Sequence, residues 1–94
     1  MDLLHQFFNN NKDLWFERMI GGYKGPVYYR MIRIDKTNTE IRLERFYPQT
    51  RKWQYDSIMK IEYLAKLEIV VDEEIIGYLN AELAKLLLIK KDNI

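Results

Sequence analysis

Hydrophobic and polar side chains alternate most clearly in the central part of the chain. Residues 27–35, Val-Tyr-Tyr-Arg-Met-Ile-Arg-Ile-Asp, are rich in the β-branched and aromatic types that suit a strand. In residues 40–47 the run Ile-Arg-Leu-Glu gives one apolar and one wet face. The polar segments 36–39 and 48–51 predict turns, and 52–55 returns as a third strand. The pattern therefore predicts a three-stranded antiparallel meander.

The second hairpin of this meander, residues 46–55, is compatible with two registers. A four-residue loop places Trp53 opposite Phe46, whereas a shift of one residue places Trp53 opposite Tyr47. Such a shift moves every side chain to the other face of the sheet. We favour the shifted register, because it gathers Trp53 with the apolar residues of the preceding strand. An aromatic cross-strand pair stabilises either arrangement by roughly 0.2–1 kcal/mol.

The N-terminal third predicts a short helix followed by an edge strand. Asp2 is suited to cap a helix whose apolar residues, Leu3, Leu4, Phe7 and Phe8, have amphipathic spacing. The polar run 9–11 favours the end of this helix.

Residues 13–20 fit a strand, which makes the glycine-rich segment 21–26 a hairpin loop. A helix capped by Asp13 and ended by Gly21 is the alternative.

Two helices are predicted after the meander. Asp56 or Ser57 can cap the first, which runs to about Leu67 with a buried stripe at Ile58, Ile61, Leu64 and Ala65. A short apolar linker, 68–71, follows. Asp72 caps the last helix, and its apolar stripe consists of Ile75, Ile76, Leu79, Leu83, Leu86 and Leu87. Gly77 within this helix favours close packing on Trp53 or Tyr55.

These elements define an α+β fold of one domain, residues 1–94. We expect a short N-terminal helix, an antiparallel sheet of three or four strands, and two C-terminal helices packed on one face. Hydrophobic residues make up 48% of the chain, which is enough for a core without disulfides.

Cysteine is absent, which excludes thiolate catalysis and cysteine-based metal sites. The N-terminus lacks a signal-peptide pattern, and the apolar segment 75–89 is too short and too polar to span a membrane. We therefore expect a cytoplasmic protein.

Motifs with a chemical function are weak. The loop 21–26 contains glycines and a lysine but precedes a strand, so the context of a phosphate-binding loop fails. The acidic run 72–74 is explained by a helix N-terminus rather than by a metal. His5 is the single histidine, and no acid stands at a spacing that selects a partner for it. We predict no catalytic residue, no cofactor and no metal, and hence no enzyme; a site assembled from His5, tyrosines and distant acids is the remaining alternative.

Positive charge is concentrated in the meander. Residues 24–53 carry eight Lys or Arg against three acids, whereas residues 54–94 carry five against eight. A basic and aromatic segment of this kind is typical of a nucleic-acid surface. Strand alternation, however, places Arg30 and Arg33 on opposite faces, and likewise Arg42 and Arg45.

The preferred hypothesis is a small non-enzymatic binding or regulatory module, of bacterial or phage type, that acts through protein–protein contacts. Its candidate binding residues are Arg30, Arg45, Tyr47 and Trp53, because arginine and large aromatic side chains are enriched in interface cores. The partner is expected to be a protein, or a second copy of the chain contacted through helix 72–91. Nucleic-acid binding through 24–53 is the alternative function, and no membrane partner is expected.

Overall fold

In the residues that the structure describes, the chain folds into a helix, four strands, a short helix, a short strand and a long helix. The computed structural model describes residues 3–22, 24–37 and 39–92, the side chains at 61 and 90–92 excepted. The elements are α1 (Leu3–Asn11), β1 (Trp15–Met19), β2 (Pro26–Ile34), β3 (Glu40–Tyr47), β4 (Lys52–Lys60), α2 (Ile61–Leu64), β5 (Glu68–Ile69) and α3 (Glu73–Asp92). The α+β class is therefore confirmed.

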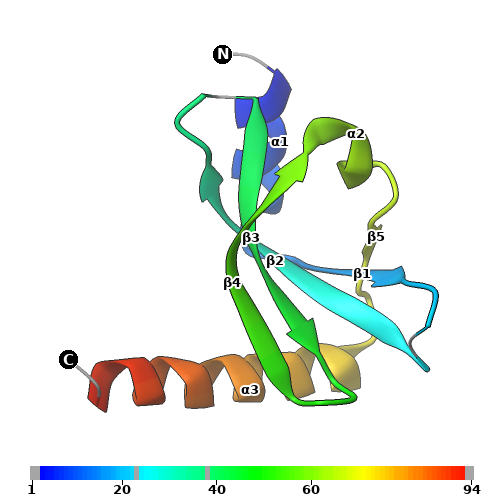
Figure 1. Cartoon of the computed structure of the whole chain (residues 1–94), viewed down its shortest axis with the longest axis vertical. Coiled ribbons are helices and arrows are strands. Elements are labelled where there is room, and N and C mark those ends of the chain that lie inside the picture. Colours follow the sequence, from blue (N-terminus) through cyan, green and yellow to red (C-terminus); the bar gives the residue numbers. More distant parts are fainter. Residues whose placement is uncertain (1–2, 23, 38, 93–94) are drawn as a thin grey trace.

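Within the described residues, the strands form one antiparallel sheet in the order β4-β3-β2-β1-β5. The first four strands are joined by hairpins, and the two-residue β5 returns to the free side of β1. The predicted meander and the predicted strand within 13–20 are both present. Figure 1 shows α3, coloured yellow to red, crossing the end of the sheet where β3 turns into β4, with α1 and α2 at the other end.

Both faces of the central strands are buried, because neighbouring residues enter different core clusters. The first core cluster contains Leu4, Phe16, Val27, Tyr29, Met31, Ile41, Leu43, Met59 and Leu64. The second core cluster contains Trp15, Tyr28, Phe46, Val70 and Leu79. Strands β1 and β2 thus supply consecutive aromatic residues to opposite faces of the sheet, as period-two alternation requires.

The prediction that two C-terminal helices pack on one face is not confirmed. Leu64 of α2 belongs to the first core cluster, which also takes Leu4 of α1. Leu79 of α3 belongs to the second, with Ile75 and Ile76 packed around it. The sheet therefore has helices on both faces, and α3 covers its own face alone among the described helices.

The predicted helix from 56 or 57 to 67 is largely wrong. Strand β4 continues through Ser57 and Met59, which lie opposite Leu43 and Ile41 of β3, and the helix is reduced to the four residues of α2. Of the expected buried stripe, Leu64 is buried, whereas Ile58 and Ala65 are exposed. Pairing with β3 outweighs the local capping signal of Asp56 and Ser57, because it buries Met59 in the first core cluster.

The favoured register of the β3–β4 hairpin is also wrong. Trp53 lies opposite Phe46, and Tyr47 lies opposite Lys52. The loop 48–51 closes this register with Arg51 in the left-handed region, at φ 54°. Trp53 therefore joins the second core cluster, with its ring centroid 4.7 Å from that of Phe46.

Two β-bulges shift the pairing within the sheet. In β2 the register changes between Met31 and Arg33, so that Ile32 is the additional residue. In β4 the register changes between the partners of Leu43 and Arg45. The second bulge lets Trp53 face one cluster and Met59 the other.

The predicted start of α3 is confirmed in detail. The Asp72 carboxylate accepts hydrogen bonds from the backbone N–H groups of Glu74 and Ile75, at 2.9 and 3.4 Å. Gly77 does not pack on Trp53 or Tyr55, because nothing lies within 4 Å of the position that a Cβ would occupy. The proposed cap at Asp2 lies outside the described residues. No helix among the described residues is long and apolar enough to cross a membrane.

Candidate functional site

The four residues predicted to bind a partner lie on two faces of the sheet. Arg45 pairs with Tyr29 across β2 and β3, and Tyr47 packs against the first core cluster. Trp53 packs against the second core cluster, and Arg30 lies opposite Trp15, a member of that cluster. The structure therefore brings these residues together in two pairs and does not form one site from them.

Arg45 has an unusual environment at the first face. Its guanidinium carbon lies 5.6 Å from the centre of the Tyr29 ring, a cation–π geometry that follows from their direct cross-strand pairing. Its Nε is buried, and no described residue accepts a hydrogen bond from it. Burial raises the pKa of the Tyr29 hydroxyl, although Arg45 and Arg18 act in the opposite direction, so this hydroxyl stays protonated at neutral pH.

A hollow of about 450 Å³ opens beside Arg45, and we call it the Arg45 concavity. Its charged lining residues are Arg18, Glu40, Arg45 and Lys60. Its other lining residues are Ile20, Tyr29, Ile58, Met59 and Tyr63. Three cations against one acid give this concavity a positive charge above an apolar and aromatic lining.

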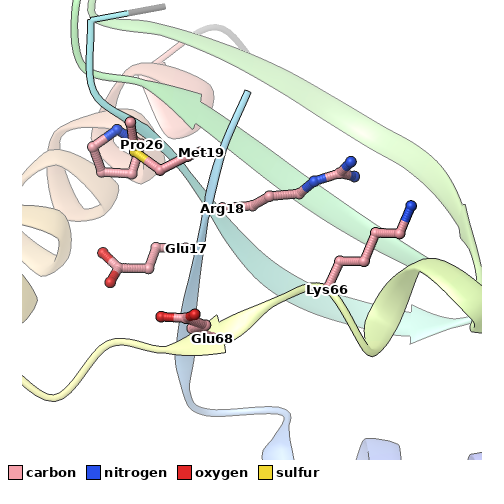
Figure 2. A pocket seen from close by; sticks show the side chains of 6 residues that line it. All are labelled: Glu17, Arg18, Met19, Pro26, Lys66 and Glu68. Atoms are coloured by element: carbon pink, nitrogen blue, oxygen red, sulfur yellow. The ribbon is translucent and has the colours of Figure 1, made fainter. Parts of the chain in front are cut away.

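A second hollow, of about 300 Å³, adjoins it at the edge formed by β1 and β5. Figure 2 shows Arg18 and Lys66 extending to one side of this edge and the carboxylates of Glu17 and Glu68 lying on the other. Glu17 and Glu68 are direct cross-strand partners, which explains why they share a face. Arg18 lines both hollows, so the positive charge continues from Arg45 towards Lys66.

On the opposite face, β4 and α3 enclose a third hollow, of about 550 Å³, which we call the β4–α3 groove. Its lining residues are Arg51, Lys52, Trp53, Tyr55, Glu82, Lys85, Leu86 and Ile89. Trp53 is thus the one predicted binding residue that lies in this groove.

Glu82 connects the hairpin loop to α3 within the groove. Its buried carboxylate accepts hydrogen bonds from Arg51 at 2.9 Å and from Lys85 at 3.3 Å. Burial alone raises the pKa of Glu82, but these two hydrogen bonds and the positive charges of Arg51 and Lys85 together outweigh burial and leave the pKa below its ordinary value. Glu82 therefore remains ionised, and its negative charge is matched by two cations.

Arg30 and Arg33 are arranged differently from the expected alternation, whereas Arg42 and Arg45 lie on opposite faces of β3 as expected. Arg30 lies opposite Glu44, and Arg33 lies opposite Arg42, because the bulge at Ile32 shifts the register between them. Since residues 42 and 44 share a face of β3, the bulge places Arg30, Arg33 and Arg42 on one side. The prediction that Arg30 and Arg33 lie on opposite faces is therefore wrong.

Carboxylates neutralise two of these three arginines. Arg33 contacts the Asp56 carboxylate at 3.0 Å, and Arg42 contacts Asp35 at 2.8 Å and Asp56 at 3.5 Å. The hydrogen bond from Arg42 lowers the pKa of Asp35 and raises that of Arg42 itself. This side of the sheet is an ion-pair network with little free positive charge.

In the described residues, no group of three or more His, Asp or Glu side chains stands close enough to hold a metal ion. The loop between β1 and β2 joins two strands of one hairpin, as Met19 pairs with Pro26. The acidic residues at 72–74 begin α3, where Asp72 acts as a cap.

Sequence reasoning did not identify Arg18, Lys60, Tyr63 or Lys66. These residues lie on β1, at the end of β4, on α2 and after α2, and they lack a common motif. The fold brings Arg18, Lys60 and Tyr63 to the concavity that Arg45 lines and Lys66 to the adjoining hollow, and this arrangement does not follow from periodicity.

Comparisons with models of protein families, with curated proteins and with solved structures find no match to this chain.

Proposed function

We propose that the protein is a non-enzymatic binding module that acts through protein–protein contacts, with the β4–α3 groove as its docking surface. The observation that carries this proposal is a set of exposed apolar residues beside the groove. Ile89 of α3 and Tyr55 of β4, which line the groove, are 58 and 47% exposed, and Leu87 and Leu88 on the adjacent sides of α3 are 55 and 61% exposed. Exposed apolar residues with a polar rim are typical of an interaction site.

The groove has the composition of an interface core. Trp53 and Tyr55 supply large aromatic surface at low entropic cost, and Arg51 supplies a planar cation at the rim. Leu79 and Leu86 of α3 are buried within the molecule, whereas Leu87, Leu88 and Ile89, which follow Leu86, are more than half exposed. They are therefore available to a partner.

Charge selects an acidic partner over a second copy of the chain. The rim carries three cations, Arg51, Lys52 and Lys85, and Glu82, to which Arg51 and Lys85 are paired, supplies one negative charge, so the net charge of the rim is positive. A two-fold contact places the same patch on both subunits, so a homodimer through this groove would bring basic rims together. An amphipathic segment with acidic residues complements both the rim and the apolar floor.

A displayed library of random peptides tests this proposal. We expect selected peptides to combine Asp or Glu with aromatic or leucine residues, and to lose at least about tenfold in affinity when Ile89 is replaced by glutamate. The matched control is Leu3→Glu, which introduces the same charge at an exposed leucine of α1 and should leave binding unchanged. Selected peptides that bind the Ile89→Glu variant equally well would refute the proposal.

Analytical ultracentrifugation of the unliganded protein tests whether a second copy of the chain, rather than an acidic partner, occupies the groove. The charge argument predicts a monomer at micromolar concentration. A dimer that dissociates in Ile89→Glu but persists in Leu3→Glu would assign the groove to a second copy and overturn the acidic partner.

A further inference from the structure

We propose that the Arg45 concavity is a binding site for a small molecule that carries an oxyanion, a carboxylate or a phosphate, on an apolar body. The site lies against the first core cluster, across the sheet from the β4–α3 groove, and does not depend on the function proposed for that groove. Each part of such a ligand corresponds to a feature of the lining.

The buried Nε of Arg45 is the first feature. A buried donor without an acceptor destabilises a folded protein, and such groups in native structures call for an explanation. No described residue accepts a hydrogen bond from this atom, and the side chain that carries it lines the concavity. Because Nε is screened from solvent, the Arg45 side chain must turn towards a bound oxyanion for this atom to donate to it, and such a ligand would then supply the acceptor that the fold does not.

The neighbouring cations are the second feature. Arg18 and Lys60 line the same concavity. No described carboxylate comes within ion-pair distance of Arg18, Arg45 or Lys60, whereas Arg33, Arg42 and Arg51 are all paired. Glu40 lies directly opposite Lys60 in the ladder and is the single acid of the lining. This excess of positive charge in the lining favours a ligand that carries one anionic group.

The remaining lining defines the rest of the ligand. Met59 is buried, Ile20 is half-buried, and the Tyr29 hydroxyl stays protonated and can donate a hydrogen bond. Tyr63 is 44% exposed at the mouth. The volume of about 450 Å³ falls within the range of about 300–1,000 Å³ that is usual for small-molecule sites. An extended polymer would need a longer channel.

Calorimetric titration of the full chain with four probes tests this inference. Benzoate and phenyl phosphate carry the two oxyanions on an apolar ring, benzamide is the neutral match, and inorganic phosphate lacks the ring. We expect benzoate or phenyl phosphate to bind about tenfold or more tightly than benzamide and inorganic phosphate. The tighter of the two identifies the oxyanion.

Variants locate the binding. Arg45→Gln should weaken the binding of the better probe by about tenfold or more, and Arg45→Lys should recover part of it. Lys52→Gln, which removes a cation from the opposite groove, should have no effect. Arg18→Gln, at the half-buried rim, gives a second reading if Arg45→Gln does not fold.

Four results would overturn the inference. They are the absence of binding by both ring anions up to about 10 mM, equal binding of benzamide, equal binding of inorganic phosphate, and an equal loss in Lys52→Gln. Peptide selection at the β4–α3 groove is unaffected by any of them, so the two proposals fail separately.

Discussion

Asp56 combines an unusual backbone with a structural role. Its φ is 51°, in the left-handed region, and it lies in the β4 bulge where residues 55 and 56 together oppose Glu44. Aspartate tolerates this region better than most residues, because its short polar side chain can bond locally. The bulge directs the Asp56 carboxylate to Arg33 and Arg42, which would otherwise face each other as like charges.

We predict that Asp56→Gly is more stable than Asp56→Ala, by about 1 kcal/mol. Both variants lose the ion pairs. Alanine is also strained in a left-handed backbone conformation, whereas glycine adopts that conformation without strain. Urea unfolding followed by tryptophan fluorescence measures the difference. At Gln54, in the regular part of β4, the order should reverse, with alanine more stable than glycine. An Asp56→Ala protein as stable as Asp56→Gly would show that the backbone at this position relaxes.

At the scale of the elements, α3 has one buried and one exposed apolar side. Leu79 is fully buried in the second core cluster, whereas Leu88 is 61% exposed. We predict that Leu79→Ala lowers the free energy of unfolding by about 2–5 kcal/mol, through lost burial and a residual cavity. Leu88→Ala should change it by less than about 0.5 kcal/mol. Chemical denaturation of both variants checks this, and an equal loss would contradict the assigned faces of α3.

The elements that sequence patterns predicted correctly are those fixed by local chemistry. Asp72 caps α3 through its own carboxylate, and residues 40–43 alternate between half-buried and buried positions as their sequence predicts. The incorrect predictions concern residues whose structure is determined by pairing with a strand that is distant in the sequence. Asp56 and Ser57 resemble helix caps, yet β3 extends β4 past them. The register favoured for Trp53 assumed a single apolar face, whereas the sheet buries both.

The same limit applies to the candidate sites. Arg45 and Trp53 were predicted from residue type alone, and each lines a hollow. The cations around Arg45 come from strands and turns that are distant in sequence, so no spacing rule connects them. Arg30 and Arg33 share a face only because of the bulge at Ile32, and a bulge has no period to detect.

For the whole molecule, part of the excess charge of residues 24–53 is compensated in three dimensions. Arg33, Arg42 and Arg51 all contact carboxylates, two of which lie beyond that segment at Asp56 and Glu82. Ion-paired arginines release few counterions from a phosphate backbone, because their charge is already neutralised. Nucleic-acid binding through the meander remains the alternative function, and its strength should depend on freeing these side chains.

We predict that the protein binds single- or double-stranded DNA and RNA only weakly at low ionic strength, and that Asp56→Asn strengthens this binding. The substitution removes the acceptor charge shared by Arg33 and Arg42, and it keeps a residue type that tolerates the left-handed backbone. On duplex DNA, each arginine released to a phosphate should steepen the logarithmic salt dependence by about 0.9. Fluorescence anisotropy with labelled oligonucleotides across a salt series measures both the affinity and this slope.

Gln54→Ala, a neutral change on the same strand, is the control. Tight binding by the unmodified protein, with a slope of several units that Arg30→Gln reduces, would instead establish the meander as a nucleic-acid surface and displace the protein-binding proposal.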